Sequence, residues 1–267
     1  MMRMIAGIAL IALGCLSAQA ARAEFTMSVP ETPPESMDTE ILGGYPAKPE
    51  KWPATLRFST KAGFCTSTAI GSQTILTAAH CVGHEEKGTV QIGGYTASVT
   101  CTHHPRYTAN DKDPNTAFDV ALCFAETPIA LPGNGRYENI NINPARPQIG
   151  TVLELVGYGC RQSDGKGPSG YLYEGLSAVV ASSWIDTYIE TLGGAAVCYG
   201  DSGGAAYINV NQYRRVIAGV NSRGDISTRS YITPIANKIV LDFIEAWAKA
   251  HNTTICGLTE PTAHCHA

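Results

Sequence analysis

Short runs rich in β-branched and other apolar residues recur along most of the chain, and Gly, Pro, Asn or Asp separates most of them. The runs cover residues 55–58, 74–77, 89–92, 97–101, 120–124, 152–158, 177–181 and 216–221. Many short strands broken by turn residues are typical of a β-sandwich or a β-barrel. No repeat with a period of roughly 20 to 50 residues is visible, which disfavours a solenoid or a propeller. The sequence therefore predicts an all-β fold.

One segment near the end of the chain has a different period. Its apolar residues recur every three to five positions, and Thr233 and Pro234 suit the cap and the first turn of a helix. We predict one amphipathic helix over residues 235–249, whose apolar stripe contacts the core. The stripe consists of Ile235, Ile239, Phe243, Ile244 and Trp247.

Composition excludes several classes of protein. Of the 267 residues, 44% are apolar and 16% are charged, so the chain can build a core and is not intrinsically disordered. The net charge is −4, and Lys and Arg are scattered with no run of three. Because phosphate backbones bind clustered basic residues, nucleic acid is not an expected partner.

The first forty residues look like targeting and processing segments. Arg3 precedes an apolar stretch over residues 4–16 and small residues up to Ala23, so residues 1–23 are predicted to be a secretory signal peptide cleaved after Ala20 or Ala23. A membrane anchor is disfavoured because the stretch is shorter than the roughly 18 to 20 apolar residues that a bilayer demands. Residues 24–40 hold three Pro, four Glu and one Asp, which predicts a linker or propeptide. The mature protein is expected outside the cytoplasm, in the extracellular space or the periplasm, with no stable membrane anchor.

Cysteine usage agrees with export. Of nine cysteines, Cys15 lies in the signal peptide, and the even number that remains predicts four disulfides in an oxidising compartment. A zinc site in the tail is the alternative, but its ligand-type residues lack the paired spacing of structural zinc sites. These residues are Cys256, His264, Cys265 and His266.

No cofactor or metal is expected. Asp111, Asp113 and Asn115 have the spacing of a calcium loop, but Thr116 and Leu122 stand where Gly and Glu are needed. The other histidines show no metal-ligand spacing and are expected on the surface. They are His84, His103, His104 and His251.

Four separate segments carry the main functional signal: Ile-Leu-Gly-Gly at 41–44, Leu-Thr-Ala-Ala-His-Cys at 76–81, Phe-Asp-Val-Ala-Leu at 118–122 and Gly-Asp-Ser-Gly-Gly at 200–204. In this order and at these separations they resemble the chymotrypsin and trypsin family of serine proteases, over about residues 41–250. The resemblance implies two six-stranded Greek-key β-barrels with a C-terminal α-helix, in one domain over residues 41–267. It also implies a serine endopeptidase.

The resemblance assigns a catalytic triad to His80, Asp119 and Ser202. A serine hydroxyl is a poor nucleophile at neutral pH unless an imidazole accepts its proton, and a buried carboxylate fixes the tautomer of that imidazole. The glycines around Ser202 let the backbone N–H groups of Gly200 and Ser202 point at the developing oxyanion.

The resemblance also implies a precursor. In the family, cleavage before the Ile-x-Gly-Gly segment frees an amine that pairs with the Asp before the nucleophile, here Ile41 with Asp201. Cleavage is then expected between Glu40 and Ile41. The alternative is that residues 24–40 are a passive tail and Ile41 simply begins a strand.

The resemblance pairs Cys65 with Cys81 beside the catalytic His. Cys101 and Cys123 flank the loop of the catalytic Asp, on strands that are neighbours in the family, so they are expected to pair. Cys160 is expected near Cys198, and Cys256 with Cys265 would close a small tail loop. The sequence alone leaves this connectivity open.

Specificity is the least constrained feature. Ala196 stands where trypsin-like members carry the Asp that binds Lys or Arg, so trypsin-like specificity is disfavoured. Ser222 and Gly224 resemble the wall that binds the substrate backbone, with Arg223 between them. Counting back from Tyr231 places Arg229 near the base of this pocket, a position that resembles lymphocyte granule proteases that cut after acidic residues. The resemblance predicts cleavage after Asp or Glu, with self-activation after Glu40. The alternative is an elastase- or chymotrypsin-like pocket for small or aromatic side chains, with Arg229 in solvent.

Two other function classes fit the sequence less well. A protease-like binding protein without catalysis is disfavoured because all three triad residues are present, and an esterase because the α/β pattern around its nucleophile is absent. Protein or peptide substrates are the expected partners, with protein inhibitors as a further class. The protein is expected to be a monomer.

Overall fold

The computed structural model describes residues 41–61, 63–83, 86–108, 118–144, 147–160, 165, 169–183, 188–211, 214–259 and 264–266. Several predictions fall outside these residues. They are the signal peptide and propeptide over 1–40, including the cleavage-site residue Glu40, the calcium-like residues Asp111, Asp113 and Asn115, and His84.

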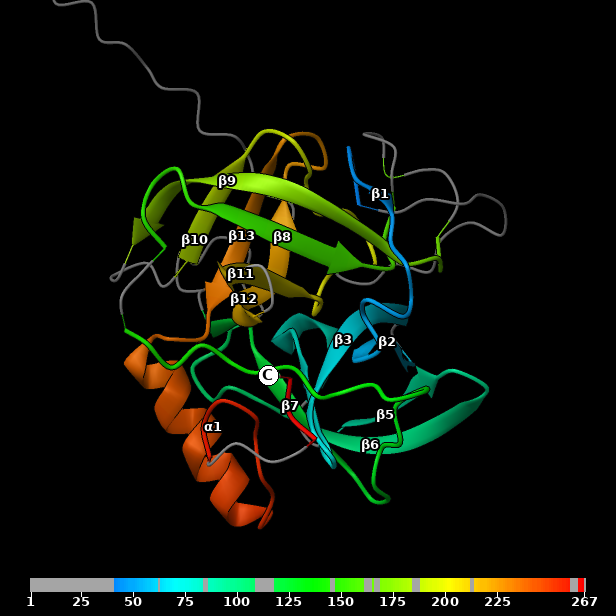
Figure 1. The fold of residues 1–267 in the computed structure, drawn as a ribbon. Helices are drawn as coiled ribbons and strands as arrows, with labels where there is room; N and C mark the ends of the chain where they lie inside the picture. The colour runs from blue at the N-terminus through cyan, green and yellow to red at the C-terminus, as the bar shows by residue number, and fades with distance from the viewer. Residues whose placement is uncertain are drawn as a thin grey trace, which may run out of the picture.

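The first barrel is built from six antiparallel strands between residues 55 and 125 (Figure 1). They are β2 (Thr55–Thr60), β3 (Gly63–Gly71), β4 (Thr74–Thr77), β5 (Glu86–Ile92), β6 (Tyr95–His103) and β7 (Ala121–Ala125). Their order around the barrel is β2-β3-β4-β7-β6-β5, and pairing of β5 with β2 closes it. The β5 strand alternates buried and exposed residues, as a strand with one face in a core must.

The second barrel has the same architecture. Its strands are β8 (Val152–Gly157), β9 (Tyr173–Ser183), β10 (Tyr188–Leu192), β11 (Ala205–Asn211), β12 (Arg214–Gly224) and β13 (Arg229–Pro234). The order β9-β10-β13-β12-β11-β8 closes because β8 also pairs with β9, and the short β1 (Tyr45–Pro46) adds to β9 outside the ring. The prediction of two six-stranded barrels is therefore confirmed.

The predicted strand runs coincide with β2, β4, β5, β6, β7, β8, β9 and β12. Four strands of the barrels were not predicted: β3, β10, β11 and β13.

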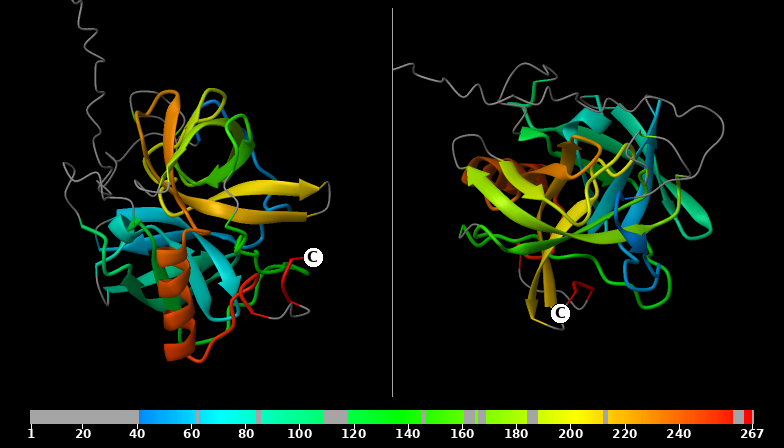
Figure 2. Two further views of the ribbon diagram at one scale, coloured as in Figure 1. Left: turned by 90° about the vertical axis from the view of Figure 1, so that its left-hand side faces the viewer. Right: turned by 90° about the horizontal axis from the view of Figure 1, so that it is seen from above.

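A single long helix follows the second barrel. The helix α1 spans Lys238–Ala250 and lies beside the first barrel (Figure 2). It packs there through ring contacts of Phe243 with His104 and of Trp247 with Phe124. Within the described residues, no helix is long and apolar enough to cross a membrane.

The predicted start of this helix was wrong. Thr233 and Pro234 end β13 and pair with Val220 and Gly219 of β12, so they belong to the sheet rather than to a helix cap. The helix begins at Lys238, three residues after the predicted start at Ile235. Its N-cap is Asn237, whose side chain accepts a hydrogen bond from the Ile239 backbone N–H at 2.9 Å.

Candidate active site

His80 and Asp119 meet at one end of the first barrel. His80 lies in the short 3₁₀ turn Ala79–Cys81 after β4, and Asp119 lies in the segment before β7. The distance between His80 Nδ1 and Asp119 Oδ2 is 2.7 Å, and the His80 backbone N–H donates to Asp119 Oδ1 at 2.9 Å. Both side chains are buried, so this carboxylate fixes the orientation of the imidazole ring.

Ser222 of β12 adds a third hydrogen bond to this carboxylate. Its hydroxyl donates to Asp119 Oδ2 at 2.6 Å. Burial alone would raise the pKa of Asp119, but the neighbouring His80 and the hydrogen bonds from His80 and Ser222 together hold that pKa below its usual value. Asp119 is therefore an anion at neutral pH, suited to stabilise a protonated imidazole.

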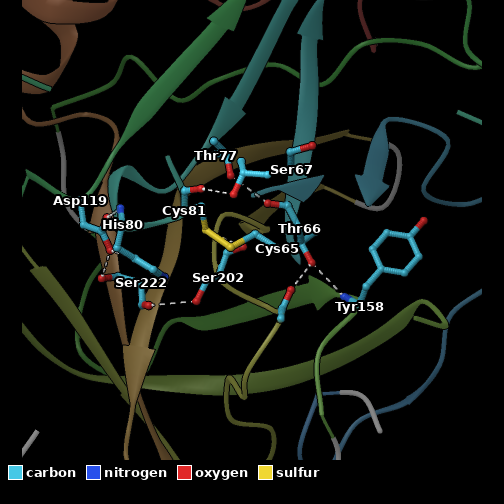
Figure 3. Close-up of a disulfide and its surroundings, with 12 residues drawn as sticks. Cys65, Thr66, Ser67, Thr77, His80, Cys81, Asp119, Tyr158, Ser202 and Ser222 are labelled. Carbon is cyan, nitrogen blue, oxygen red and sulfur yellow. Dashed lines mark hydrogen bonds and ion pairs between the residues drawn. A yellow bond between two sulfur atoms is a disulfide. The ribbon is translucent and has the colours of Figure 1, made fainter. Parts of the chain in front are cut away.

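Ser202 comes from the second barrel and lies next to Ser222, the residue that contacts Asp119. It lies in the loop between β10 and β11, and its hydroxyl donates to the Ser222 carbonyl oxygen at 3.4 Å (Figure 3). His80 Nε2 is buried and has no hydrogen-bond partner among the described residues. A buried nitrogen that neither donates nor accepts is unusual, because polar atoms removed from water normally find partners.

Residues 198–204 are called here the oxyanion loop, after the role expected of Gly200 and Ser202. They carry Gly200 at a φ of 94°, a conformation that favours glycine. A Cβ on Gly200 would lie 2.6 Å from a ring carbon of Phe64. The Gly200 carbonyl accepts a hydrogen bond of 2.7 Å from the Thr66 hydroxyl, and the Ser202 carbonyl accepts one of 2.9 Å from the Thr66 N–H. The loop is thus held against β3.

Asp201 and Ile41 are both fully buried. The Asp201 carboxylate accepts hydrogen bonds from the backbone N–H groups of Gly159 at 2.7 Å and Cys198 at 2.9 Å. Ile41 lies in the core of the second barrel, and the adjacent Leu42 exchanges two backbone hydrogen bonds with Ala196. The segment that begins at Ile41 is therefore docked beside the residue expected at the pocket base.

Ala196 lies in a small apolar cluster. Besides Ala196 the cluster contains Leu42, the disulfide-bonded Cys160 and Cys198, and the partly buried Ile226.

Arg229 is paired with an acidic side chain. It begins β13, and its guanidinium forms an ion pair with Glu190 of β10. About a third of the Arg229 side chain remains exposed. Its neighbour Ser230 is fully buried, and the Ser230 hydroxyl accepts a hydrogen bond from the Val197 N–H at 2.9 Å.

Arg223, between Ser222 and Gly224, lies near one aromatic ring. Its guanidinium lies 5.5 Å from the centre of the Tyr231 ring. Burial lowers the pKa of Arg223, and the negative charge of Asp119 partly offsets this.

All four expected disulfides are present: Cys65–Cys81, Cys101–Cys123, Cys160–Cys198 and Cys256–Cys265. Both sulfurs beside His80 are in the Cys65–Cys81 bond and are not available to a metal. The Cys256–Cys265 bond decides the tail in favour of a disulfide over a zinc site.

The expectation that His104 lies on the surface was wrong. This residue is buried, stacked on Phe118 at 4.7 Å between ring centres. Burial lowers the pKa of His104.

Sequence reasoning also missed Thr66, because its hydrogen-bond partners lie in other strands and loops. The one available signal was its place directly after Cys65, which brings it next to the turn that carries His80 through the Cys65–Cys81 bond.

Comparisons with known proteins give a consistent result. A family model described as trypsin matches residues 41–243, a range that contains the candidate catalytic, oxyanion, activation and substrate-binding residues. Serine protease 1 of Canis lupus familiaris is 28% identical over 198 residues, which cover 64% of this chain and 76% of that protein. Neutrophil elastase of Mus musculus is 25% identical over 243 residues, 85% of this chain and 88% of that protein. Trypsin of Sus scrofa is 26% identical over 201 residues, 66% of this chain and 83% of that protein.

Proposed function

The chain belongs to the trypsin family of serine proteases, and on that premise we propose that it is a secreted serine endopeptidase whose catalytic residues are His80, Asp119 and Ser202. The observation that carries this proposal is the 2.7 Å contact of His80 Nδ1 with Asp119 Oδ2, combined with a buried Nε2 that has no partner among the described residues. An imidazole held in this way can accept a proton through Nε2. The protease-like binding protein remains the competing function class.

The reaction then proceeds in two stages. Ser202 Oγ attacks the substrate carbonyl while His80 Nε2 takes its proton, and Asp119 stabilises the imidazolium. The N–H groups of Gly200 and Ser202 bind the oxyanion of the tetrahedral intermediate. His80 returns the proton to the leaving amine, and a water molecule then hydrolyses the acyl-enzyme by the same route.

Activation is proposed to follow cleavage between Glu40 and Ile41. The burial of Ile41 and Asp201 supports this, because a new amine on Ile41 would need a charged partner in the core. A carboxylate and an amine that both lose water are stable only as a pair, so the pair would link cleavage to the conformation of the oxyanion loop. The four disulfides support export to an oxidising compartment.

For specificity we favour small or aromatic side chains before the scissile bond. Ala196 brings a methyl group to the position where trypsin-like members carry an Asp, and it packs with Leu42 and Ile226, which suits an apolar side chain. Arg229 is the basis of the acidic alternative, but its charge is already paired with Glu190. With this specificity, self-cleavage after Glu40 is not expected, and a separate protease would activate the precursor.

The test uses protein processed to begin at Ile41, a serine-directed phosphonate probe and a mixed-sequence peptide library. We expect the probe to label the processed protein and not the Ser202→Ala variant, with cleavage after small aliphatic or aromatic residues. Absence of both labelling and cleavage would favour the binding-protein alternative. Cleavage after Asp or Glu would keep the enzyme and overturn the specificity.

A further inference from the structure

The Thr66 side chain sits between two segments of the second barrel, although Thr66 belongs to the first. Its hydroxyl donates to the Gly200 carbonyl at 2.7 Å and accepts from the Tyr158 N–H at 3.0 Å (Figure 3). Thr66 is fully buried. One hydroxyl thus satisfies a buried acceptor and a donor that belong to different loops.

The backbone of Thr66 is fixed on both sides as well. Its N–H donates to the Ser202 carbonyl at 2.9 Å, and its own carbonyl accepts from the Thr77 hydroxyl at 3.0 Å. Thr77 lies in β4, just before the turn that carries His80. The position of Thr66 is therefore set by the catalytic half of the first barrel.

The bond from the Thr66 hydroxyl fixes a peptide unit that glycine alone would leave free. The peptide that joins Gly200 to Asp201 is held at both ends, because its N–H also donates to the Cys198 carbonyl at 3.1 Å. With this unit held, the φ and ψ of Gly200 together determine where the Gly200 N–H points, and its φ of 94° is one that favours glycine. The Thr66 hydroxyl also accepts from the Tyr158 N–H, and the N–H of the next residue, Gly159, donates to the Asp201 carboxylate.

We propose that Thr66 is a positioning residue, whose hydroxyl orients the oxyanion loop by joining Gly200 to Tyr158. This proposal rests on the proposed protease function, since it assigns a role within that same site. Thr66 itself touches no reacting atom. It acts by orienting the Gly200 N–H, which donates a hydrogen bond to the oxyanion.

The test compares Thr66→Val, which keeps the shape and removes the hydroxyl, with Thr66→Ser, which keeps the hydroxyl. In Thr66→Val we expect kcat to fall by roughly 10- to 100-fold with little change in KM, less than the roughly 10²- to 10³-fold typical of losing an oxyanion donor outright. The affinity for a peptide boronate, which forms a tetrahedral adduct with the nucleophile, should fall by the same factor. Thr66→Ser should restore kcat to near wild type.

Ser67→Ala is the matched control. Ser67 is the next residue of β3, is equally buried, and donates to the Leu56 carbonyl at 3.3 Å instead of to the oxyanion loop. This variant should keep wild-type kcat. If Thr66→Val does not accumulate as folded protein, Thr66→Ala replaces it, because alanine adds no atom to the site.

Hydrogen exchange gives a readout that does not need activity. The Tyr158 amide should exchange faster in Thr66→Val than in wild type or Thr66→Ser. If the wild type is active and Thr66→Val has the same kcat, the proposal is overturned. It is also overturned if kcat falls as much in Thr66→Ser as in Thr66→Val. An inactive wild type would contradict the protease function, and unchanged Tyr158 exchange would then still overturn the role of Thr66.

Discussion

The Ser222 hydroxyl donates at 2.6 Å to Asp119 Oδ2, the carboxylate oxygen that also lies 2.7 Å from His80 Nδ1. The carbonyl of the same Ser222 accepts from the Ser202 hydroxyl at 3.4 Å. One residue of the second barrel therefore contacts both the acidic residue of the first barrel and the serine of its own barrel.

Ser222→Ala should lower kcat/KM by about tenfold, the scale of one hydrogen bond to a charged group. The bond from Ser222 helps to keep the pKa of Asp119 low, so its loss raises that pKa and weakens the stabilisation of the imidazolium. Peptide hydrolysis measured from pH 4 to 9 checks this. Wild-type kcat/KM across the range would show that the hydroxyl contributes nothing to catalysis.

Arg229→Ala should leave the preferred residue before the scissile bond unchanged, because Arg229 is already paired with Glu190. Glu190→Ala is the matched variant, which leaves the guanidinium unpaired and is expected to raise cleavage after Asp or Glu. A peptide library measures both. A loss of acidic cleavage in Arg229→Ala would instead place the guanidinium in the pocket.

Removing two different disulfides is expected to lower stability in both cases but to change specificity in only one. Replacing both cysteines of Cys101–Cys123 or both of Cys160–Cys198 by serine should lower the free energy of unfolding by about 2 to 5 kcal/mol in each case. Only the second change should alter selectivity among peptides, because Cys160 and Cys198 pack with Ala196. Denaturant unfolding and library cleavage are the measurements. Equal selectivity in the two double variants contradicts the role of the apolar cluster.

The buried His104 predicts a pH dependence of stability. Burial, and next the charges of Arg106 and His103, keep the pKa of His104 below its ordinary value of 6.5, while a hydrogen bond to the Ile239 carbonyl opposes them. As the pH falls below 6.5, the unfolded chain binds a proton that the folded chain does not, so the free energy of unfolding falls until the folded group also protonates. His104→Gln should flatten this slope between pH 6.5 and the lowered pKa. Urea unfolding at several pH values checks it, and identical slopes in both proteins would contradict it.

Strands were predictable where short apolar runs end at turn residues. The two barrels were predictable because four motifs stand in the order found in the trypsin family. The β3 strand escaped because residues 65–71 are buried without interruption, which leaves no alternation to detect. The helix start escaped because Pro234, a common first residue of helices, is paired in a sheet here. Sheet register is set by distant strands and overrides local preference.

Within the site, His80 and Asp119 were predictable because each lies inside a short motif. Thr66 was not, since its hydroxyl binds the backbone of Gly200 and Tyr158, and a backbone partner leaves no mark on the sequence. The partner of Arg229 was equally hidden, because Glu190 meets it only through the pairing of β10 with β13.

The helix α1 also bears on how the protein is made in the cell. Phe118 precedes Asp119 directly, and it packs on His104, which in turn contacts Phe243 of α1. The tail reaches the first barrel too, where the Cys256 N–H donates to the Ile70 carbonyl at 2.8 Å. The half of the molecule that the ribosome delivers early is therefore completed by residues it delivers last. A nascent chain released before α1 would carry the histidine and the aspartate without the packing of Phe243 on His104, so the surroundings of this pair are complete only when the last part of the chain has been made.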